Sequence, residues 1–462
     1  MKSKLWVFRD VNLTQRASLA QALSISPATA SLFLARGVTT PDEATTWMSL
    51  QTPHDPFLIP DMEQAVERLH RAVTTQEPIC FYGDYDVDGI TATSVYLSFF
   101  GGLGAQVRAY VPHRLREGYG LNLGAVQRLH DEGISLLVTS DCGTTSHKEI
   151  SLAASLGMDV VVTDHHQTDE GMPPAVAVLN PHRAGARYPF LGLCSAALAY
   201  KVSQAYQLRY GVAGVPLESL LDLVALATVA DVVPLQDENR SFVREGLVQL
   251  SRGARCGVRA LKQVAGVSQD CTAETIAYKL APRINAAGRL DDAMLGVRLL
   301  TTDDPDEAQR LADRLEQLNR ERQRIEVDIM AEALASLKDQ ELSPALVLAS
   351  RHWHLGVVGI VAARLVDRFQ RPAIVMAINE QGIAKGSART TGGFDLYEGL
   401  ASCREMLEAF GGHPSAAGVT IRESRIDEFR ARFSDVVAGW THGGAKVPTL
   451  NVDAEVRLDE VN

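Results

Sequence analysis

The sequence predicts an α/β protein in which a doubly wound parallel-sheet domain is joined by a long helix to a smaller α/β domain. Three observations lead to this fold class. Short apolar runs alternate with helical patterns from Pro78 to Thr163, apolar residues recur at helical spacing from Asp306 to Leu337, and a second α/β pattern begins beyond Pro344. Such alternation is typical of βαβ units, which build parallel sheets.

Residues 1–50 are expected to form a helical lead-in, with helices at Ala17–Leu23 and Ala28–Ala35 separated by Pro27. The first α/β domain is expected over residues 51–302. Its predicted strands are Ile79–Tyr82, Val107–Val111, Leu136–Ser140 and Val160–Thr163, and its predicted helices are Ile90–Phe100, Leu123–His130 and Ser146–Leu156.

A charged stretch without Gly or Pro predicts a long connecting helix within residues 303–342. The smaller domain is expected over residues 343–440. Its predicted strands are Ala345–Ala349, Ala373–Ile378, Ile383–Ser387 and Ala417–Ile421, and its predicted helices are Val358–Phe369, Leu396–Phe410 and one ending near Ala438. In residues 441–462, the stretch Leu450–Leu458 alternates like a strand, which we interpret as the start of a further, truncated β domain.

Composition indicates an ordinary globular protein, because 46% of the residues are hydrophobic and 22% are charged. No apolar run approaches the length of a membrane span, so we expect a cytoplasmic protein without membrane contact. The six cysteines form no CxxC pair, which argues against a zinc ribbon or a disulfide framework. A net charge of −11 argues against non-specific coating of nucleic acid, but carboxylates can bind cations that then neutralise substrate phosphates.

Three carboxylates, Asp84, Asp86 and Asp88, occupy alternate positions between a predicted strand and a predicted helix. If this segment is extended, they point to one side. The carboxyl ends of strands form the ligand crevice of a doubly wound sheet, so these acids lie where a site is expected. A solvated turn or a helix N-cap would explain this loop equally well by itself.

The same placement recurs along the chain. Asp141 follows a second predicted strand, and Asp164-His165-His166 follows a third. Asp231 is a lone acid in an apolar run, and an acid is costly to bury unless it is paired or coordinates a metal. This mixture of ligands suits Mn²⁺, with Mg²⁺ or Zn²⁺ as alternatives, and a shared carboxylate suits a two-metal phosphoester site.

Together these segments resemble the four motifs of the DHH phosphoesterases, with the spacing of the RecJ branch. The quoted motifs are residues 84–89, 140–143, 163–166 and 229–231. Similar segments continue at residues 112–120, 282–289, 354–360, 385–389 and 411–418, so the resemblance covers about residues 40–440. It implies a DHH catalytic domain, a DHH-associated substrate-binding domain and an OB-type domain beginning in residues 441–462.

The resemblance also implies roles for single residues. One metal would be held by Asp86, Asp141, His165 and Asp231, and a second by Asp84 with Asp141 as the bridge. His166 would face the scissile phosphate, with Asp88 and Asp164 in supporting roles. The two ions, Mn²⁺ or Mg²⁺, would activate a water for in-line attack on phosphorus.

Substrate contacts follow from the same resemblance. Ser387, Arg389 and Arg114 resemble the anchor for a 5′ phosphate, which arginine grips bidentately. His413 would reach the cleft between the domains. The nucleic-acid backbone would contact three further residues: Arg283, Asn285 and Arg289. For these three, helix-end capping and surface ion pairing remain the alternative.

The chain departs from the family pattern at a few positions. Tyr82 stands where some members carry His, and Ala388 stands where Gly is frequent. Ser195 and Ala197 replace glycines that are common in the family, and we expect both on packing surfaces.

The resemblance implies a single-stranded-DNA-specific 5′-to-3′ exonuclease that releases mononucleotides in recombination and repair. A single-strand-binding protein and a helicase are the expected partners of a monomer. One alternative is a phosphodiesterase of short oligonucleotides or cyclic dinucleotides. The other alternative is an inactive scaffold protein of the same fold.

Overall fold

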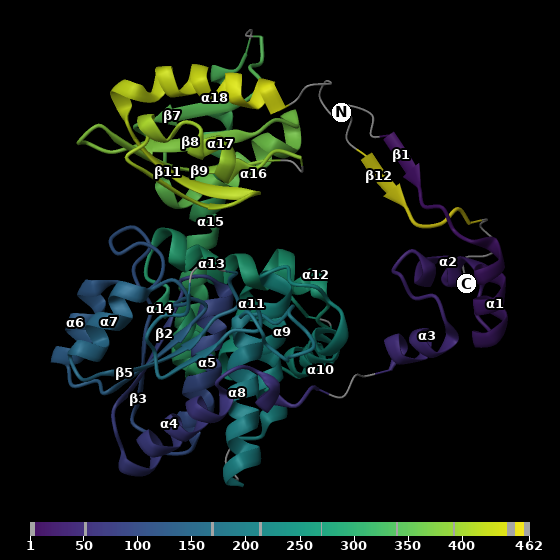
Figure 1. Ribbon diagram of the computed structural model, residues 1–462, viewed down its shortest axis with the longest axis vertical. Helices are drawn as coiled ribbons and strands as arrows, with labels where there is room; N and C mark the ends of the chain where they lie inside the picture. The colour runs from purple at the N-terminus through teal and green to yellow at the C-terminus, as the bar shows by residue number, and fades with distance from the viewer. Residues whose placement is uncertain are drawn as a thin grey trace. The chain divides into compact units, whose positions relative to one another are not determined.

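The computed structural model describes residues 5–49, 53–167, 171–211, 215–268, 270–338, 341–390, 393–440 and 449–456. The chain divides into two compact units (Figure 1). One unit is Leu50–Arg322, and the other combines Met1–Ser49 with Gln323–Asn462. Because this division groups both ends of the chain in one unit, the finer domain boundaries expected from the sequence stay predictions.

The Leu50–Arg322 unit contains a five-stranded sheet in the order β3-β2-β4-β5-β6. Its strands are β2 (Ile79–Gly83), β3 (Val107–Tyr110), β4 (Leu136–Ser140), β5 (Asp159–Thr163) and β6 (Ala177–Leu179). All neighbouring strands are parallel, which confirms the predicted doubly wound sheet. The strand order reverses between β2 and β4, and this switch point is where such sheets bind ligands.

Helices cover both faces of this sheet because its strands are apolar on both faces. In β2, Phe81 packs into one core and Tyr82 into the other, as the two-residue period of a strand requires. One face is covered by α4 (Met62–Thr75), α5 (Val87–Gly102) and α8 (Ser195–Tyr210), and the other by α6 (Leu123–Asp131) and α7 (His147–Ser155) (Figure 1).

Further helices follow that the sequence patterns did not predict individually. They are α9 (Leu221–Ala230), α10 (Asp237–Arg252), α11 (Cys256–Val264), α12 (Ala273–Thr275), α13 (Ala281–Leu290) and α14 (Met294–Thr301). Short helical turns are η1 (Pro56–Leu58), η2 (Leu217–Leu220) and the π-helical η3 (Ile276–Leu280). Helix α9 is largely apolar and buried on all sides apart from its last residues, so it shows no amphipathic period that would mark it as a helix.

A fully buried ion pair fixes α8 against α10. Lys201 Nζ lies 2.6 Å from Glu238 Oε2, and both side chains are 0% exposed. The ammonium group also donates to the His54 carbonyl at 2.8 Å, and the Tyr188 hydroxyl donates to Glu238 Oε1. Because both charges are fully desolvated, each depends on the other for compensation.

The second unit contains a mixed sheet in the order β10-β11-β9-β8-β7. Its strands are β7 (Leu346–Ser350), β8 (Ala373–Ile378), β9 (Ile383–Arg389), β10 (Ala409–His413) and β11 (Ala416–Arg422). Only β7 and β8 are parallel. Its helices are α16 (Leu355–Phe369), α17 (Leu396–Ala401) and α18 (Ile426–Trp440), of which α16 and α18 lie on opposite faces (Figure 1). The predicted long helix is α15 (Pro305–Ser336), which contains residues of both units.

One predicted helix of this unit is wrong in its second half. The helix expected at Leu396–Phe410 ends at Ala401, and Ala409–His413 instead forms β10, antiparallel to β11. Glycine destabilises a helix, and Gly411 and Gly412 directly follow the predicted one. At Gly412, φ is +140°, and an added Cβ would lie 2.5 Å from the Ala416 carbonyl oxygen. The hairpin therefore depends on glycine at this position.

The N-terminal segment contains the two predicted helices, α1 (Leu13–Leu23) and α2 (Pro27–Leu34), and a third, α3 (Pro41–Met48). It also contains β1 (Leu5–Phe8), which pairs in parallel with β12 (Thr449–Val452). The expected strand at Leu450–Leu458 is therefore shorter and shifted by one residue. Residues 441–448 and 457–462 lie outside the described residues, so the OB-type interpretation stays a prediction. Within the described ranges, no single helix has the length and apolar character to cross a membrane. Helices α1 and α2 reach that length and composition only when taken together, and the chain bends by 116° between them.

Candidate metal centre

Three aspartates lie at the carboxyl ends of neighbouring strands, and backbone hydrogen bonds hold them there. The N–H of Asp84 donates to the Ser140 carbonyl at 3.2 Å, and the N–H of Asp141 donates to the Thr163 carbonyl at 3.1 Å. The N–H of Asp164 donates to the Leu179 carbonyl at 3.1 Å. Each bond continues a parallel ladder by one residue, so the three side chains start from fixed positions at the switch point of the sheet.

Asp86 and Asp88 shape the loop that follows β2. Asp86 Oδ1 accepts from the N–H groups of Asp88 at 2.9 Å and Gly89 at 3.2 Å, which caps α5. The two carboxylate oxygens of Asp88 accept from the N–H groups of Ser195 at 2.7 Å and Ala196 at 2.9 Å, at the start of α8. Asp88 therefore joins the loop to α8, and Asp86 is both a helix cap and a candidate ligand.

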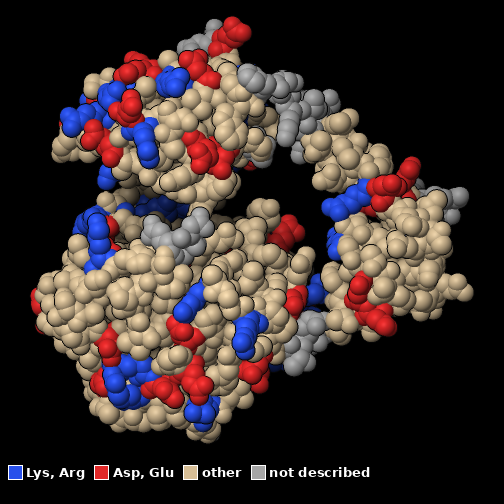
Figure 2. Space-filling view, in the orientation of Figure 1, with Lys and Arg blue, Asp and Glu red and all other residues tan. Residues whose placement is uncertain are grey.

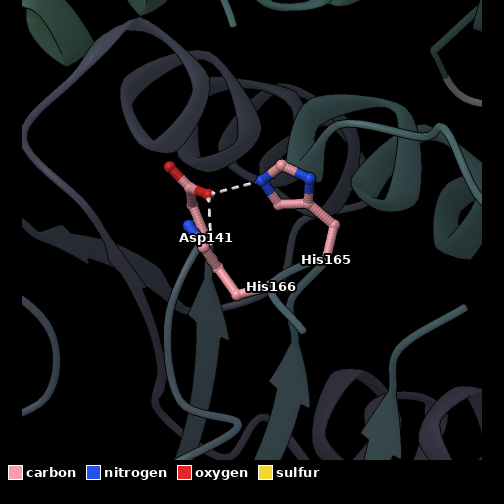
Figure 3. Close-up of side chains that lie close together, drawn as sticks. All are labelled: Asp141, His165 and His166. Atoms are coloured by element: carbon pink, nitrogen blue, oxygen red, sulfur yellow. Dashed lines mark hydrogen bonds and ion pairs between the residues drawn. The ribbon is translucent and has the colours of Figure 1, made fainter. Parts of the chain in front are cut away.

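The imidazole of His165 lies at the centre of the carboxylates. His165 Nε2 is 3.2 Å from Asp141 Oδ1 (Figure 3). It is also 3.7 Å from Asp231 Oδ2. Three groups of side chains bring their potential ligand atoms within 4.8 Å of one another: Asp84, Asp86 and Asp141; Asp141, His165 and His166; and Asp88, His165 and Asp231. Asp141 belongs to two of these groups, as a bridging ligand must.

The second histidine is held by different partners. His166 Nδ1 lies 2.7 Å from Asp164 Oδ1, which also accepts from the N–H groups of His165 and His166. The hydroxyl of Tyr119 donates to the Asp141 carbonyl at 3.0 Å and lies 3.4 Å from His166 Nδ1. His166 Nδ1 therefore has Asp164 as its nearest partner, and it also lies 3.9 Å from Asp141 Oδ1 (Figure 3).

Burial makes the ionised carboxylates unfavourable in the absence of a cation. Burial, followed by the charge of Asp86, raises the pKa of Asp84 well above its usual range. Burial, followed by the charge of Asp88, does the same to the pKa of Asp141 and raises the pKa of Asp231 to about 8. Asp84 Oδ1 is buried and has no hydrogen-bond partner among the described residues. These donors therefore fit a divalent cation, which would supply the missing counter-charge.

Asp164 and His166 behave in the opposite way. Burial by itself would raise the pKa of Asp164, but the hydrogen bond from His166 outweighs burial and lowers this pKa to about 2. Burial would likewise lower the pKa of His166, but the same hydrogen bond raises it to about 9. Both shifts favour a charged pair, which keeps His166 Nδ1 engaged with Asp164.

The metal-free protein is expected to lose stability as pH rises. Folding raises the pKa of Asp231 from 3.8 to about 8, so the folded state binds this proton more tightly, and the free energy of unfolding falls across that window. Folding also raises the pKa of His166 from 6.5 to about 9, so this group lowers the free energy of unfolding further as the pH rises through that range. Mn²⁺ competes with protons for the carboxylates, so it should raise the melting temperature more at pH 8 than at pH 5.

Differential scanning calorimetry with EDTA and with Mn²⁺, at pH 5, 6.5 and 8, checks this prediction. The ionised Asp164 stabilises the folded protein throughout this pH range, because its contribution is lost only when the pH falls from 3.8 to about 2. A metal-induced shift that is independent of pH would contradict the expectation.

Two residues in the site were not predicted to be there. Ser195 was expected on a packing surface, but its Oγ donates to Asp141 Oδ1 at 3.2 Å. Tyr119 touches both Asp141 and His166; it lies in the family-like segment 112–120, from which no role was predicted for it. Ala197 is buried in the apolar core as expected. Tyr82 is buried on the other face of the sheet, where its hydroxyl donates to the Gly120 carbonyl at 2.9 Å, so it supplies no ligand.

The expected substrate-binding residues of the Leu50–Arg322 unit differ in the side chains and backbone groups that they contact. The guanidinium of Arg114 lies 4.6 Å over the ring of Tyr85, beside the motif loop. Asn285 Oδ1 accepts from the Val87 N–H at 3.2 Å, while Arg289, on the same helix α13, is half-buried. Arg283 Nε lies 2.7 Å from Glu316 Oε2, so its side chain makes the ion pair that was the alternative to a substrate contact.

In the second unit, Ser387 and Arg389 occupy alternate positions on β9 and share one face of the sheet. Both lie beside Gly359 of α16, where an added Cβ would be 3.0 Å from Ser387 Oγ and 3.5 Å from Arg389 Nη2. His413 is exposed at the end of β10. On the face shown in Figure 2, basic and acidic side chains are interspersed rather than gathered into one basic surface.

Comparisons with known proteins cover both units. The model of the DHH family, N-terminal domain, matches residues 78–228, and the DHHA1 domain model matches residues 342–439. The chain is 39% identical over 461 residues to the single-stranded-DNA-specific exonuclease RecJ of Bacillus subtilis, covering 99% of this chain and 58% of that relative. It is 39% identical over 434 residues to the RecJ of Dickeya dadantii, covering 89% and 75%. The crystal structure of Thermus thermophilus RecJ in complex with Mn²⁺ matches with a TM-score of 0.84 and 31% identity, covering 97% and 64%.

Proposed function

The chain belongs to the RecJ family of DHH phosphoesterases, and on that premise we propose that it is a single-stranded-DNA-specific 5′-to-3′ exonuclease that releases mononucleotides. The observation that carries the proposal is the cluster of carboxylates and imidazoles around Asp141 at the switch point of the sheet. A phosphodiesterase of short oligonucleotides and an inactive scaffold are not favoured, because both curated relatives described above are exonucleases.

All of the proposed metal ligands belong to this cluster, which supports the proposal. Asp86, Asp141, His165 and Asp231 would hold one Mn²⁺ or Mg²⁺ ion, and Asp84 with Asp141 would hold a second. When bound, such ions supply positive charge that activates water and neutralises the phosphate in the transition state. Ser195 and Tyr119 would orient Asp141, and Asp164 would orient His166 toward the scissile phosphate.

Ser387 and Arg389 would anchor the 5′ phosphate of the substrate, and Arg114 is also proposed as a phosphate contact. A planar guanidinium binds phosphate through two parallel hydrogen bonds, which suits the recognition of a strand end. Asn285, Arg289 and His413 remain proposed contacts to the strand. Arg283 is the weakest of the proposed contacts, because Glu316 already pairs with it.

Membership of this family supports a role of the reaction in DNA recombination and repair, which is part of the proposal. We propose a cytoplasmic monomer that acts on single strands exposed by a helicase and coated by a single-strand-binding protein. The chain spans 58% and 75% of the two curated relatives, so the activity itself is the first property to test.

The test is Mn²⁺-dependent release of mononucleotides from end-labelled single-stranded DNA. The substrates are a 5′-phosphorylated strand, a 3′-blocked strand, a 5′-blocked strand and a duplex. Release from the first two alone would support the proposed polarity and strand preference. Short oligonucleotides and cyclic dinucleotides are tested beside these strands. Cleavage restricted to them would favour the first alternative, and metal binding without any cleavage would favour the scaffold.

Replacing Tyr119 by Phe is expected to lower kcat about 3- to 10-fold with little change in KM. The substitution keeps the ring but removes one hydrogen bond to the Asp141 carbonyl, and a single neutral bond contributes about 1 kcal/mol. Steady-state kinetics on single-stranded DNA measures both constants. Tyr278→Phe is the matched control, because Tyr278 is 77% exposed. Equal kcat values for the two variants would show that the Tyr119 hydroxyl does not position the site.

A further inference from the structure

The residue that follows Asp231 has a backbone conformation that its type disfavours. Val232 has a φ of +59°, in the left-handed region, directly after the end of α9. Glycine is the usual residue at this position after a helix. A side chain there crowds the backbone, and a β-branched side chain is a clear outlier. Valine therefore destabilises this turn relative to glycine.

Packing does not offset this strain. Val232 is 86% exposed, the highest value among the large apolar residues that the structure describes as exposed. Pro234 is also exposed, and Leu235 is 41% exposed. A single exposed apolar residue is ordinary. A strained valine that buries almost none of its side chain contributes little to folding, which points to a role in function.

This apolar segment starts at the metal centre. Asp231 Oδ2 lies 3.7 Å from His165 Nε2, and Val232 is the next residue in the chain. The cluster itself consists of carboxylates and imidazoles, which suit cations and phosphate. A nucleotide also has a base, and the broad faces of a base are apolar and contact apolar or aromatic side chains.

We propose that Val232–Leu235, here called the apolar rim, is a nucleobase-binding subsite beside the metal centre, with Val232 as its main contact. The proposal rests on the proposed function and deepens it. In a duplex, base faces are covered by stacking, whereas an unstacked base presents its face. The rim therefore contributes to the preference for single strands, which phosphate contacts alone do not provide.

Three substitutions of Val232 test the rim. Val232→Gly and Val232→Asn both suit a left-handed backbone and remove the apolar side chain, whereas Val232→Leu keeps apolar bulk. Val327→Ala is the matched control, because Val327 is 67% exposed on α15. The substrates are 5′-phosphorylated single strands with natural bases, and the same strands with abasic tetrahydrofuran residues at the first two positions.

Each variant is measured in three ways: its melting temperature, its KM and kcat with Mn²⁺, and its Kd for each strand with Ca²⁺ in place of Mn²⁺. Val232→Gly and Val232→Asn are expected to raise the melting temperature, because the strain is relieved. They should raise KM and Kd for the natural strand about 3- to 10-fold, as expected for losing one exposed apolar contact. On the abasic strand, the variants and the unmodified chain should have equal KM and Kd values. On the natural strand, Val232→Leu should raise KM and Kd less than Val232→Asn does.

Two results would contradict the proposal that the apolar rim binds a base. One is a Val232→Gly variant with wild-type KM and Kd for the natural strand. The other is an equal loss on natural and abasic strands, which would mean that the contact is not to a base. Failure of the proposed function appears differently, as absence of cleavage by the unmodified chain. In that case the Kd values for the natural and abasic strands, measured with Ca²⁺, still show whether Val232 contacts a base.

Discussion

Replacing Asp141 by Asn is expected to lower kcat/KM for single-stranded DNA by about 10³-fold or more, because this carboxylate is shared between the candidate ligand groups. The side chain lies 3.2 Å from both His165 Nε2 and Ser195 Oγ, so it is the common partner of the site. Asparagine has nearly the same shape but no negative charge. It would leave the fold intact while removing the bridging ligand.

Mn²⁺ affinity, measured by isothermal titration calorimetry, separates this explanation from a simple loss of folding. Asp141→Asn should weaken Mn²⁺ binding, with circular dichroism unchanged. Asp131→Asn is the matched control, because the Asp131 side chain is 63% exposed and lies at the end of α6, outside the motifs. Full activity of Asp141→Asn would remove the central claim about the metal centre.

Lys201→Met is expected to destabilise the Leu50–Arg322 unit by about 3–5 kcal/mol, because it leaves the Glu238 carboxylate buried without its counter-charge. The Lys201 ammonium also donates to the His54 carbonyl, which would lose its partner. Since α8 carries at its first turn the N–H groups that bind Asp88, we expect the loss to weaken Mn²⁺ binding as well. Urea unfolding followed by circular dichroism measures the change.

The double variant Lys201→Met with Glu238→Leu should recover most of the stability, because a buried ion pair can often be replaced by apolar residues. Arg425→Ala is the control for an exposed pair with Glu428 at 3.3 Å, and it should cost less than about 0.5 kcal/mol. A loss below about 1 kcal/mol for Lys201→Met alone would mean that water reaches Glu238 and compensates the charge.

Local sequence patterns determined most of the elements that carry the site. Strands β2, β4 and β5 have short, nearly continuous apolar runs, because helices cover them on both faces. The long helix α15 has a clear amphipathic period. Since parallel strands deliver their carboxyl ends to one edge of the sheet, the sequence alone also predicts that Asp84, Asp141 and His165 lie near one another.

Other features depend on contacts between distant parts of the chain, and only the tertiary structure decided them. Asp231 reaches His165 from the end of the buried helix α9, which shows no period in the sequence. Ser195 touches Asp141 because Asp88 fixes the start of α8 at the site. Strand β1 is recognisable only through its pairing with β12, more than 400 residues away.

The sequence by itself therefore determined the fold class, the order of most strands and helices, and the chemistry expected at the strand ends. The tertiary structure decided which side chains meet: it paired Arg283 with Glu316 and placed residues 409–410, the end of a predicted helix, in strand β10. The physical reason is the range of the interactions. Periodicity and turn preferences act between neighbours along the chain, whereas packing and ion pairing act between residues that only folding brings together.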